Sequence, residues 1–244
     1  MRPPLAAVLF DLDDTLHDDT ATYRGAAGRV AHDVAGTHAI EADALLGAYV
    51  AQAETFWQSL GAESLGTPLV DVRAKMWRAA LGAVGLSDEA LAARCGVDYN
   101  RYRRELLQLW PGALELLARL RDGGCKLALI TNGFAETHRE KIALLALEDA
   151  FDEIFIADEV GLLKPDVRLF RLAAERLGVE ANACAMVGDR FERDVRGAHD
   201  AGMFTVWMNV RDETVPHSGP QPDAIVRRIA EVEGVLPLAP LGSL

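Results

Sequence analysis

The sequence predicts an α/β fold: a parallel β-sheet flanked by helices, with a block of helices inserted after the first strand. Five short runs of strand length are largely apolar and do not alternate, which is typical of strands covered on both faces. Helix-period stretches separate the later runs, and such alternation predicts a parallel sheet. The first and second runs are more than a hundred residues apart, far more than a crossover connection needs.

The expected strands of this sheet are residues 5–10, 127–131, 154–157, 183–187 and 204–208. Helices are expected between the later strands, at residues 136–147, 167–177 and 192–201. Residues 215–222 are rich in Pro and Gly and predict a surface loop, and the chain after Val235 is expected to be a poorly ordered end.

The long gap after the first strand predicts four helices, at residues 20–35, 41–60, 68–84 and 99–109, because Ala, Leu, Glu, Gln and Arg are prominent there. The turn residues of Trp110-Pro111-Gly112 indicate a return to the sheet domain. We therefore expect an α/β core of residues 1–16 and 111–244 and a helical insertion of residues 17–110. Since ligands bind beyond the carboxyl ends of parallel strands, the insertion is expected to cover the site as a cap.

The charge of the chain excludes some classes of partner. Twenty-five basic and 37 acidic residues give a formal charge of −12, which repels nucleic-acid polymers and anionic membrane surfaces. The first apolar run is too short for a signal peptide and leads directly into Asp11, Asp13 and Asp14. We expect a cytoplasmic protein.

Cysteine and histidine residues show no spacing typical of metal ligands. Cys95, Cys125 and Cys184 are scattered and odd in number, which predicts reduced thiols in the core. His17, His138 and His199 have no partner at metal spacing, so surface or capping roles are expected for them.

Polar residues follow four of the predicted strands. They are Asp11-Leu12-Asp13-Asp14-Thr15 after the first, Thr131-Asn132-Gly133 after the second, Gly161-Leu162-Leu163-Lys164-Pro165 after the third, and Gly188-Asp189 with Asp194 after the fourth. Each alone has an ordinary explanation as a helix cap, a turn or a surface charge. Together, at the edge where parallel strands present ligands, they predict one site.

This ordered set resembles the haloacid dehalogenase superfamily, whose motifs are D-x-D-x-T, a Ser/Thr, a Lys and G-D-x-x-x-x-D. The resemblance covers essentially the whole core and implies a Rossmann-like fold with an inserted helical cap. The stretches T-N-G-F, E-V-G-L-L-K-P and V-G-D-R-F-E-R-D look most like its small-metabolite phosphatases, among them nucleotidases and N-acylneuraminate-9-phosphatase. A magnesium-dependent phosphoric monoester hydrolase acting on a small-molecule phosphate ester is therefore expected.

The resemblance also implies roles for the motif residues. Asp11 would form an aspartyl-phosphate, and Asp13 would protonate the leaving oxygen and then deprotonate water. Mg²⁺ would be held by Asp11, the main-chain carbonyl of Asp13 and Asp189, with support from Asp194. The phosphoryl oxygens would be bound by Thr131, Asn132 and Lys164.

Two other functions stay open at this stage. A haloacid dehalogenase uses the same first Asp without a metal, but it needs neither an acid such as Asp13 nor the pair Asp189 and Asp194. A non-catalytic regulatory member of the fold would usually lack one of these carboxylates.

Contacts with a substrate's leaving group are expected from the insertion, although aromatic residues at helical spacing are more often core and Arg runs more often solvated. The candidates are Tyr23, Trp57, Arg73, Lys75, Trp77, Arg101, Tyr102, Arg103 and Arg104. The sequence identifies neither the ester nor the oligomeric state.

Overall fold

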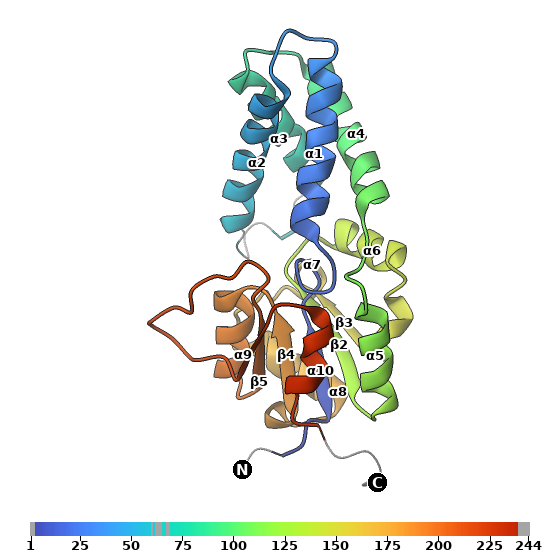
Figure 1. The fold of residues 1–244 in the computed structure, drawn as a ribbon, viewed down its shortest axis with the longest axis vertical. Helices are drawn as coiled ribbons and strands as arrows, with labels where there is room; N and C mark the ends of the chain where they lie inside the picture. Colours follow the sequence, from blue (N-terminus) through green and yellow to red (C-terminus); the bar gives the residue numbers. More distant parts are fainter. Residues whose placement is uncertain (1–2, 60, 62–64, 67–68, 239–244) are drawn as a thin grey trace. The chain divides into compact units, whose positions relative to one another are not determined.

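The computed structural model describes residues 3–59, 61, 65–66 and 69–238. The chain divides into two compact units (Figure 1): Met1–Asp18 with Gln108–Leu244, and Asp19–Leu107. We call them the α/β unit and the helical unit. No helix among the described residues combines the length and the apolar character needed to cross a membrane.

The α/β unit is built on a six-stranded parallel sheet (Figure 1). Its strands are β1 (Ala7–Phe10), β2 (Lys126–Thr131), β3 (Glu153–Ile156), β4 (Cys184–Gly188), β5 (Phe204–Met208) and β6 (Ala224–Val226), in the spatial order β3-β2-β1-β4-β5-β6. The parallel α/β fold is confirmed, and the five expected strands form within two residues of their expected ends. Strand β6 was not expected, because it has only three residues and follows the Pro-rich loop.

Burial on both faces explains why the central strands are apolar throughout. All four residues of β1 are buried. One face packs on α8 (Val167–Leu177) and α9 (Arg196–Asp200), where Ala7 and Leu9 of β1 join a core with Leu169, Phe170 and Ala198. The apolar stripe of α8 at helical spacing is thus buried against the sheet, and α8 has the expected bounds.

The described residues of this unit form four further α-helices: α5 (Ala113–Asp122), α6 (Ala135–Leu144), α7 (Ala157–Val160) and α10 (Val232–Val235). The helix expected at residues 192–201 forms, but its first part, Phe191–Val195, is a five-residue π-helix that leads directly into the short α9. Such wide turns are frequent at functional sites, and this one carries the buried side chain of Asp194.

The helical unit contains α1 (Asp19–Ala35), α2 (Ala42–Gln58), α3 (Leu69–Ala83) and α4 (Glu89–Leu106). The expected ends at Leu60 and Pro68 lie outside the described residues. Helix α4 begins ten residues earlier than expected, and its start is stabilised by Asp88, whose side chain accepts a hydrogen bond from Leu91 N at 2.9 Å. Asp is favoured at this position because its carboxylate accepts a hydrogen bond from an otherwise unpaired N–H group of the first turn.

Three aromatic rings pack together in the core of the helical unit. Tyr49 and Trp77 stack with their centroids 4.1 Å apart, and Tyr99 lies 5.2 Å from Tyr49. Trp77 is completely buried and Arg103 is 7% exposed. Trp77 therefore packs the unit's interior, and the alternative role considered for it, contact with a leaving group, is wrong for this structure.

Candidate active site

The motif residues lie where the order of the strands in the sheet reverses. From β1 the chain continues to β2 and β3 on one side and then to β4 on the other, so the carboxyl ends of β1 and β4 flank a topological switch point. Ligands of open α/β sheets bind at such points. Asp11 follows β1 directly and Asp189 follows β4, and Asp11 N still donates a hydrogen bond to Val187 O at 2.9 Å.

Three buried carboxylates gather at this point. Asp11, Asp189 and Asp194 each offer an oxygen, and these oxygens all lie within 4.8 Å of one another. Asp194 Oδ2 accepts a hydrogen bond from Arg190 N at 2.8 Å. A Cβ atom on Gly188 would lie 2.3 Å from Asp194 Cγ, so only glycine at the end of β4 leaves room for this carboxylate.

Lys164 joins the carboxylates. Its Nζ lies 2.7 Å from Asp11 Oδ1 and 2.6 Å from Asp194 Oδ1, and the side chain is 2% exposed. The side chain of Asn132 fixes this lysine's main chain, because Oδ1 accepts from Lys164 N at 2.7 Å and Nδ2 donates to Lys164 O at 2.8 Å. Thr131 is buried at the end of β2 beside β1.

The structure thus brings Asp11, Lys164, Asp189 and Asp194 into one group and places Thr131 and Asn132 at the neighbouring strand end. Asn132 has a function that the sequence did not reveal: its side chain hydrogen-bonds Lys164.

Burial and neighbouring negative charges raise the pKa values of two acids of this group, Asp11 and Asp189. Burial, together with the charges of Asp194 and Asp13, raises the pKa of Asp11 to about 7, although Lys164 opposes the rise. Burial and the charges of Asp11 and Asp194 raise the pKa of Asp189 well above its ordinary value. The pKa of Lys164 is also raised: burial alone would lower it, but the negative charges of Asp11 and Asp194 outweigh burial.

This group fits a small divalent cation. All its donors are carboxylate oxygens, which Mg²⁺ prefers over nitrogen or sulfur. The raised pKa values of Asp11 and Asp189 show that nearby positive charge does not fully neutralise the two carboxylates when both are ionised. A cation among the three oxygens would supply the missing positive charge.

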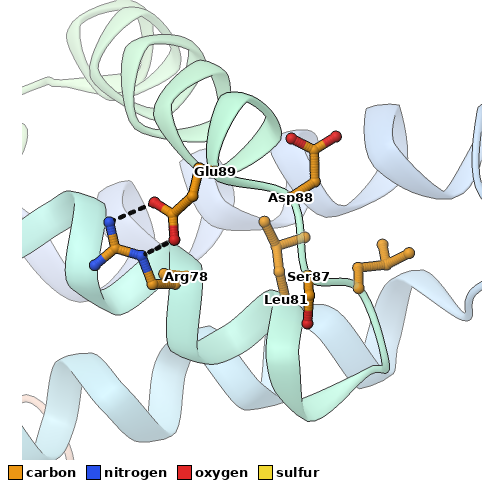
Figure 2. Close-up of a pocket in the computed structure, with 6 residues that line it drawn as sticks. Arg78, Leu81, Ser87, Asp88 and Glu89 are labelled. Carbon is orange, nitrogen blue, oxygen red and sulfur yellow. Dashed lines mark hydrogen bonds and ion pairs between the residues drawn. The ribbon is translucent and has the colours of Figure 1, made fainter.

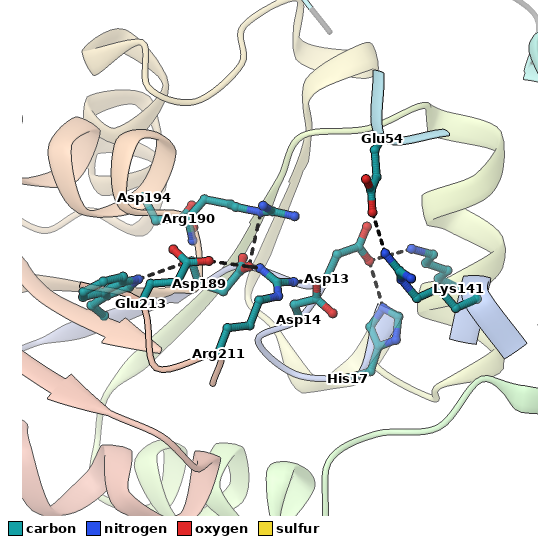
Figure 3. Close-up of polar contacts among 12 residues, drawn as sticks. Asp13, Asp14, His17, Glu54, Lys141, Asp189, Arg190, Asp194, Arg211 and Glu213 are labelled. Carbon is teal, nitrogen blue, oxygen red and sulfur yellow. Dashed lines mark hydrogen bonds and ion pairs between the residues drawn. The ribbon is translucent and has the colours of Figure 1, made fainter. Parts of the chain in front are cut away.

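Two arginines that were not predicted from the sequence also contact Asp189 (Figure 3). Arg190 Nε and Arg211 Nη1 each lie 3.3 Å from its Oδ2, and Arg211 also pairs with Asp14. Trp207 Nε1 donates to the main-chain oxygen of Asp189 at 2.9 Å. Arg190 stands inside the fourth motif, but Arg211 follows β5, where no recognisable pattern marked it.

Asp13 faces a different group of side chains. In Figure 3 its carboxylate lies beside Lys141 and His17: Oδ1 is 2.6 Å from Lys141 Nζ and 2.8 Å from His17 Nε2. His138 Nε2 lies 3.4 Å from Oδ2. Partial burial would raise the pKa of Asp13, but the charges of Lys141 and His138 hold it well below its usual range.

The surface or capping roles expected for His17 and His138 are therefore wrong. Both rings are buried, at 0% and 2% exposure, and both face Asp13. His199, which pairs with Asp200 at the surface, agrees with the expectation. The glycine after Asn132 is also explained, because a Cβ atom on Gly133 would lie 1.8 Å from Cε1 of His138.

A separate pocket is lined only by residues of the helical unit (Figure 2): Arg78, Leu81, Leu86, Ser87, Asp88 and Glu89. Its charges are already paired, since Arg78 Nε and Nη2 donate to the two carboxylate oxygens of Glu89 at 2.6 and 2.5 Å. None of the motif residues lines it. The three cysteines are buried free thiols, as expected.

Comparison with known proteins places the chain in a family. A family model described as haloacid dehalogenase-like hydrolase matches residues 5–202. A phosphoserine phosphatase from Thermus thermophilus is 34% identical over 83% of this chain and 88% of its own length. N-acylneuraminate-9-phosphatase from Mus musculus is 30% identical over 94% of this chain and 93% of its own length.

Solved structures agree with the fold. The magnesium-bound HAD-hydrolase YfnB from Bacillus subtilis has a TM-score of 0.76 at 25% identity, covering 96% of this chain and 99% of that one. A 2-haloacid dehalogenase from Pseudomonas syringae has a TM-score of 0.63 at 26% identity, covering 95% and 98%. The residues that match the family model, 5–202, include Lys164 and the motifs after β1, β2 and β4. The chain therefore belongs to the haloacid dehalogenase-like hydrolase family.

Proposed function

We propose that this protein hydrolyses phosphate monoesters of small metabolites, with Mg²⁺, through a phosphorylated Asp11. The observation that carries the proposal is the buried group of Asp11, Lys164, Asp189 and Asp194 at the switch point, with Asp13 two residues after Asp11. Several relatives are named as phosphatases of different small esters, namely phosphoserine, glyceraldehyde 3-phosphate and N-acylneuraminate 9-phosphate.

Asp11 is the proposed nucleophile. Its carboxylate attacks phosphorus in line with the leaving oxygen, which requires the ionised form. Lys164, 2.7 Å away, favours that form and adds positive charge near the transferring group. The Thr131 hydroxyl and the Asn132 main-chain N–H are the proposed hydrogen-bond donors to the phosphoryl oxygens.

Asp13 is the proposed acid and base. Lys141 and His138 favour the ionised form of Asp13, so the first half-reaction uses the minor, protonated form: as the P–O bond breaks, that carboxyl group gives its proton to the leaving oxygen and the alcohol departs neutral. The resulting carboxylate then takes a proton from the water that attacks phosphorylated Asp11, and this restores both acids and releases phosphate.

Asp11, Asp189 and the main-chain carbonyl of Asp13 would hold Mg²⁺, with Asp194 supporting the group through Lys164 and Arg190 N. When bound, the cation neutralises charge between the anionic nucleophile and the anionic ester. The chain's own contribution is to keep these oxygens together and largely away from water.

The helical insertion, residues 17–110, is the proposed cap. The site residues named above all act on the phosphoryl group, which every ester shares, so discrimination must come from contacts with the leaving group. Residues of the helical unit are the proposed source of those contacts.

A second candidate is halide displacement from a 2-haloacid, favoured by the structural likeness to a 2-haloacid dehalogenase. That reaction needs no proton donor for its leaving group and no cation. The presence of Asp13 and of three gathered carboxylates favours phosphate release.

A panel of small phosphate esters, assayed for released phosphate, tests the proposal. We expect release that EDTA abolishes and Mg²⁺ restores, and no halide release from 2-chloropropionate. In calorimetry, Mg²⁺ binding should weaken strongly in Asp189→Asn and remain in Asp158→Asn, an acid whose side chain accepts from Ala135 N instead. Full phosphatase activity without metal, or halide release, would contradict the proposal.

A further inference from the structure

Lys141 is a buried cation that the mechanism above does not use. It lies on α6 and is 2% exposed, one of four lysines in the chain. Burying an ammonium group without compensation is strongly unfavourable, so a lysine persists at such a position only when it has partners. Its Nζ lies 2.6 Å from Asp13 Oδ1.

The contacts of Asp13 are unequal at its two oxygens. Oδ1 is within hydrogen-bond distance of both Lys141 Nζ, at 2.6 Å, and His17 Nε2, at 2.8 Å. Oδ2 lies 3.4 Å from His138 Nε2, longer than a good hydrogen bond. One oxygen is therefore anchored, and the other is the better placed to exchange a proton.

Three separate features of the chain produce this arrangement. His17 lies four residues after Asp13 in the loop that follows β1. His138 and Lys141 are three residues apart, so they share one face of α6. Gly133 makes room for the His138 ring, since a Cβ there would overlap it.

We propose that Lys141 is a positioning residue for Asp13: it fixes Oδ1, with help from His17, so that Oδ2 faces the leaving oxygen and transfers the proton. This inference rests on the proposed phosphatase function. In the first half-reaction the Oδ2–H proton passes to the ester oxygen while the P–O bond breaks and phosphorus bonds to Asp11. In the second, Oδ2 takes a proton of the attacking water while the water oxygen bonds to phosphorus and the bond between phosphorus and Asp11 breaks. Lys141 itself loses no proton.

Dependence on the leaving group separates positioning from a merely structural role. The value of kcat/KM reports the step in which the alcohol departs, and a good leaving group such as p-nitrophenolate needs little protonation. We expect Lys141→Met to lower kcat/KM for an alkyl phosphate by roughly 100-fold, the low end of general-acid effects, and for p-nitrophenyl phosphate by less than about 5-fold. A structural defect would lower both alike.

Lys126→Met is the matched control. It removes the same charge and also breaks a lysine hydrogen bond, from Lys126 Nζ to Leu177 O, at the opposite end of β2. We expect it to leave the ratio between the two esters unchanged. Lys141→Arg, which keeps a cationic donor, should restore most of the alkyl phosphate activity.

A double variant tests whether Lys141 acts through Asp13. If it does, Asp13→Ala with Lys141→Met should lose no more kcat/KM for the alkyl phosphate than Asp13→Ala alone. Should Lys141→Met fail to fold, Lys141→Gln, which keeps an N–H donor without the charge, replaces it in both experiments with the same expected direction.

The outcomes are distinguishable. Equal losses for both esters, no loss in the single variants, or additive losses in the double variant would overturn the role of Lys141. If Asp13→Ala shows the leaving-group dependence and the Lys141 variants do not, only this inference falls. If the wild-type protein releases no phosphate from any ester, the proposed function falls and this inference falls with it.

Discussion

The side-chain amide of Asn132 hydrogen-bonds both the main-chain N–H and the main-chain carbonyl of Lys164, at 2.7 and 2.8 Å. The end of β2 is thereby joined to the segment that carries the buried lysine. Lys164 in turn reaches Asp11 and Asp194, which follow β1 and β4. One asparagine side chain thus links the ends of three strands of the sheet.

Asn132→Ala should therefore act through Lys164. Loss of two partly buried hydrogen bonds should lower the free energy of unfolding by about 1–3 kcal/mol. Because Lys164 serves the phosphoryl group, kcat/KM should fall by the same factor for every ester. Urea unfolding and kinetics on several esters measure the two effects. Asn132→Asp, which keeps the acceptor, should be less severe, and a change in substrate ranking would contradict this role.

Asp11→Asn should abolish phosphate release and change how stability depends on pH. The folded protein raises the pKa of Asp11 from 3.8 to about 7, chiefly by burial, so between these values the folded state holds a proton that the unfolded chain releases. Stability from this group is thus present at low pH and lost as pH rises toward 7. The asparagine has no such proton.

In EDTA, we therefore expect the wild-type protein to lose stability between pH 5 and pH 8 that Asp11→Asn does not lose. The difference in unfolding free energy, Asp11→Asn minus wild type, should increase over this range by on the order of 1–3 kcal/mol. Saturating Mg²⁺ should reduce this rise, because it favours the ionised carboxylate in the folded state. Parallel pH profiles of the two proteins in EDTA would show that Asp11 does not titrate in this range.

Gly133→Ala should be strongly destabilising, because the new Cβ would lie 1.8 Å from Cε1 of His138. His138→Ala in the same protein should recover part of the lost stability by removing the overlap. Gly47→Ala is the control: nothing lies within 4 Å of its Cβ position in α2, so about 0.5–1 kcal/mol of stabilisation is expected. Melting temperatures of the four proteins decide whether the overlap is the cause.

Most of the fold could be predicted, because burial on both faces makes the strands of a parallel sheet apolar runs that are visible in the sequence. The start of α4 was missed because Gly96 and Asp98 interrupt its helical pattern. The π-helix at Phe191–Val195 was missed because Asp194 turns inward there, and a single inward polar side chain leaves no periodic signal.

Only those residues of the candidate site that follow the ends of strands could be predicted from the sequence. Lys141 and His138 lie within α6, where a lysine and a histidine on a helix indicate a solvated face unless the partner is known. Their partner, Asp13, is more than a hundred residues away in the sequence. Arg211, in a loop after β5, was hidden for the same reason.

Two tryptophans of the helical unit should respond differently to substitution. Trp77 is completely buried and stacks on Tyr49, so Trp77→Ala should cost about 3–5 kcal/mol of stability. The milder Trp77→Phe should leave the ranking of phosphate esters unchanged. Trp57, near the end of α2, is only partly buried and packs edge-on against Phe56, so its removal leaves the aromatic core intact.

If the helical unit supplies the contacts with the leaving group, Trp57→Ala should change the relative kcat/KM values of several esters while the melting temperature changes little. Lys164→Ala should instead lower all of them together, because the phosphoryl group is common to every ester. Measuring the same ester panel on these variants compares a residue of each unit in one experiment. If Trp57→Ala scales every ester equally, this tryptophan does not select the substrate, and the same test passes to Tyr23 and Arg104 of the helical unit.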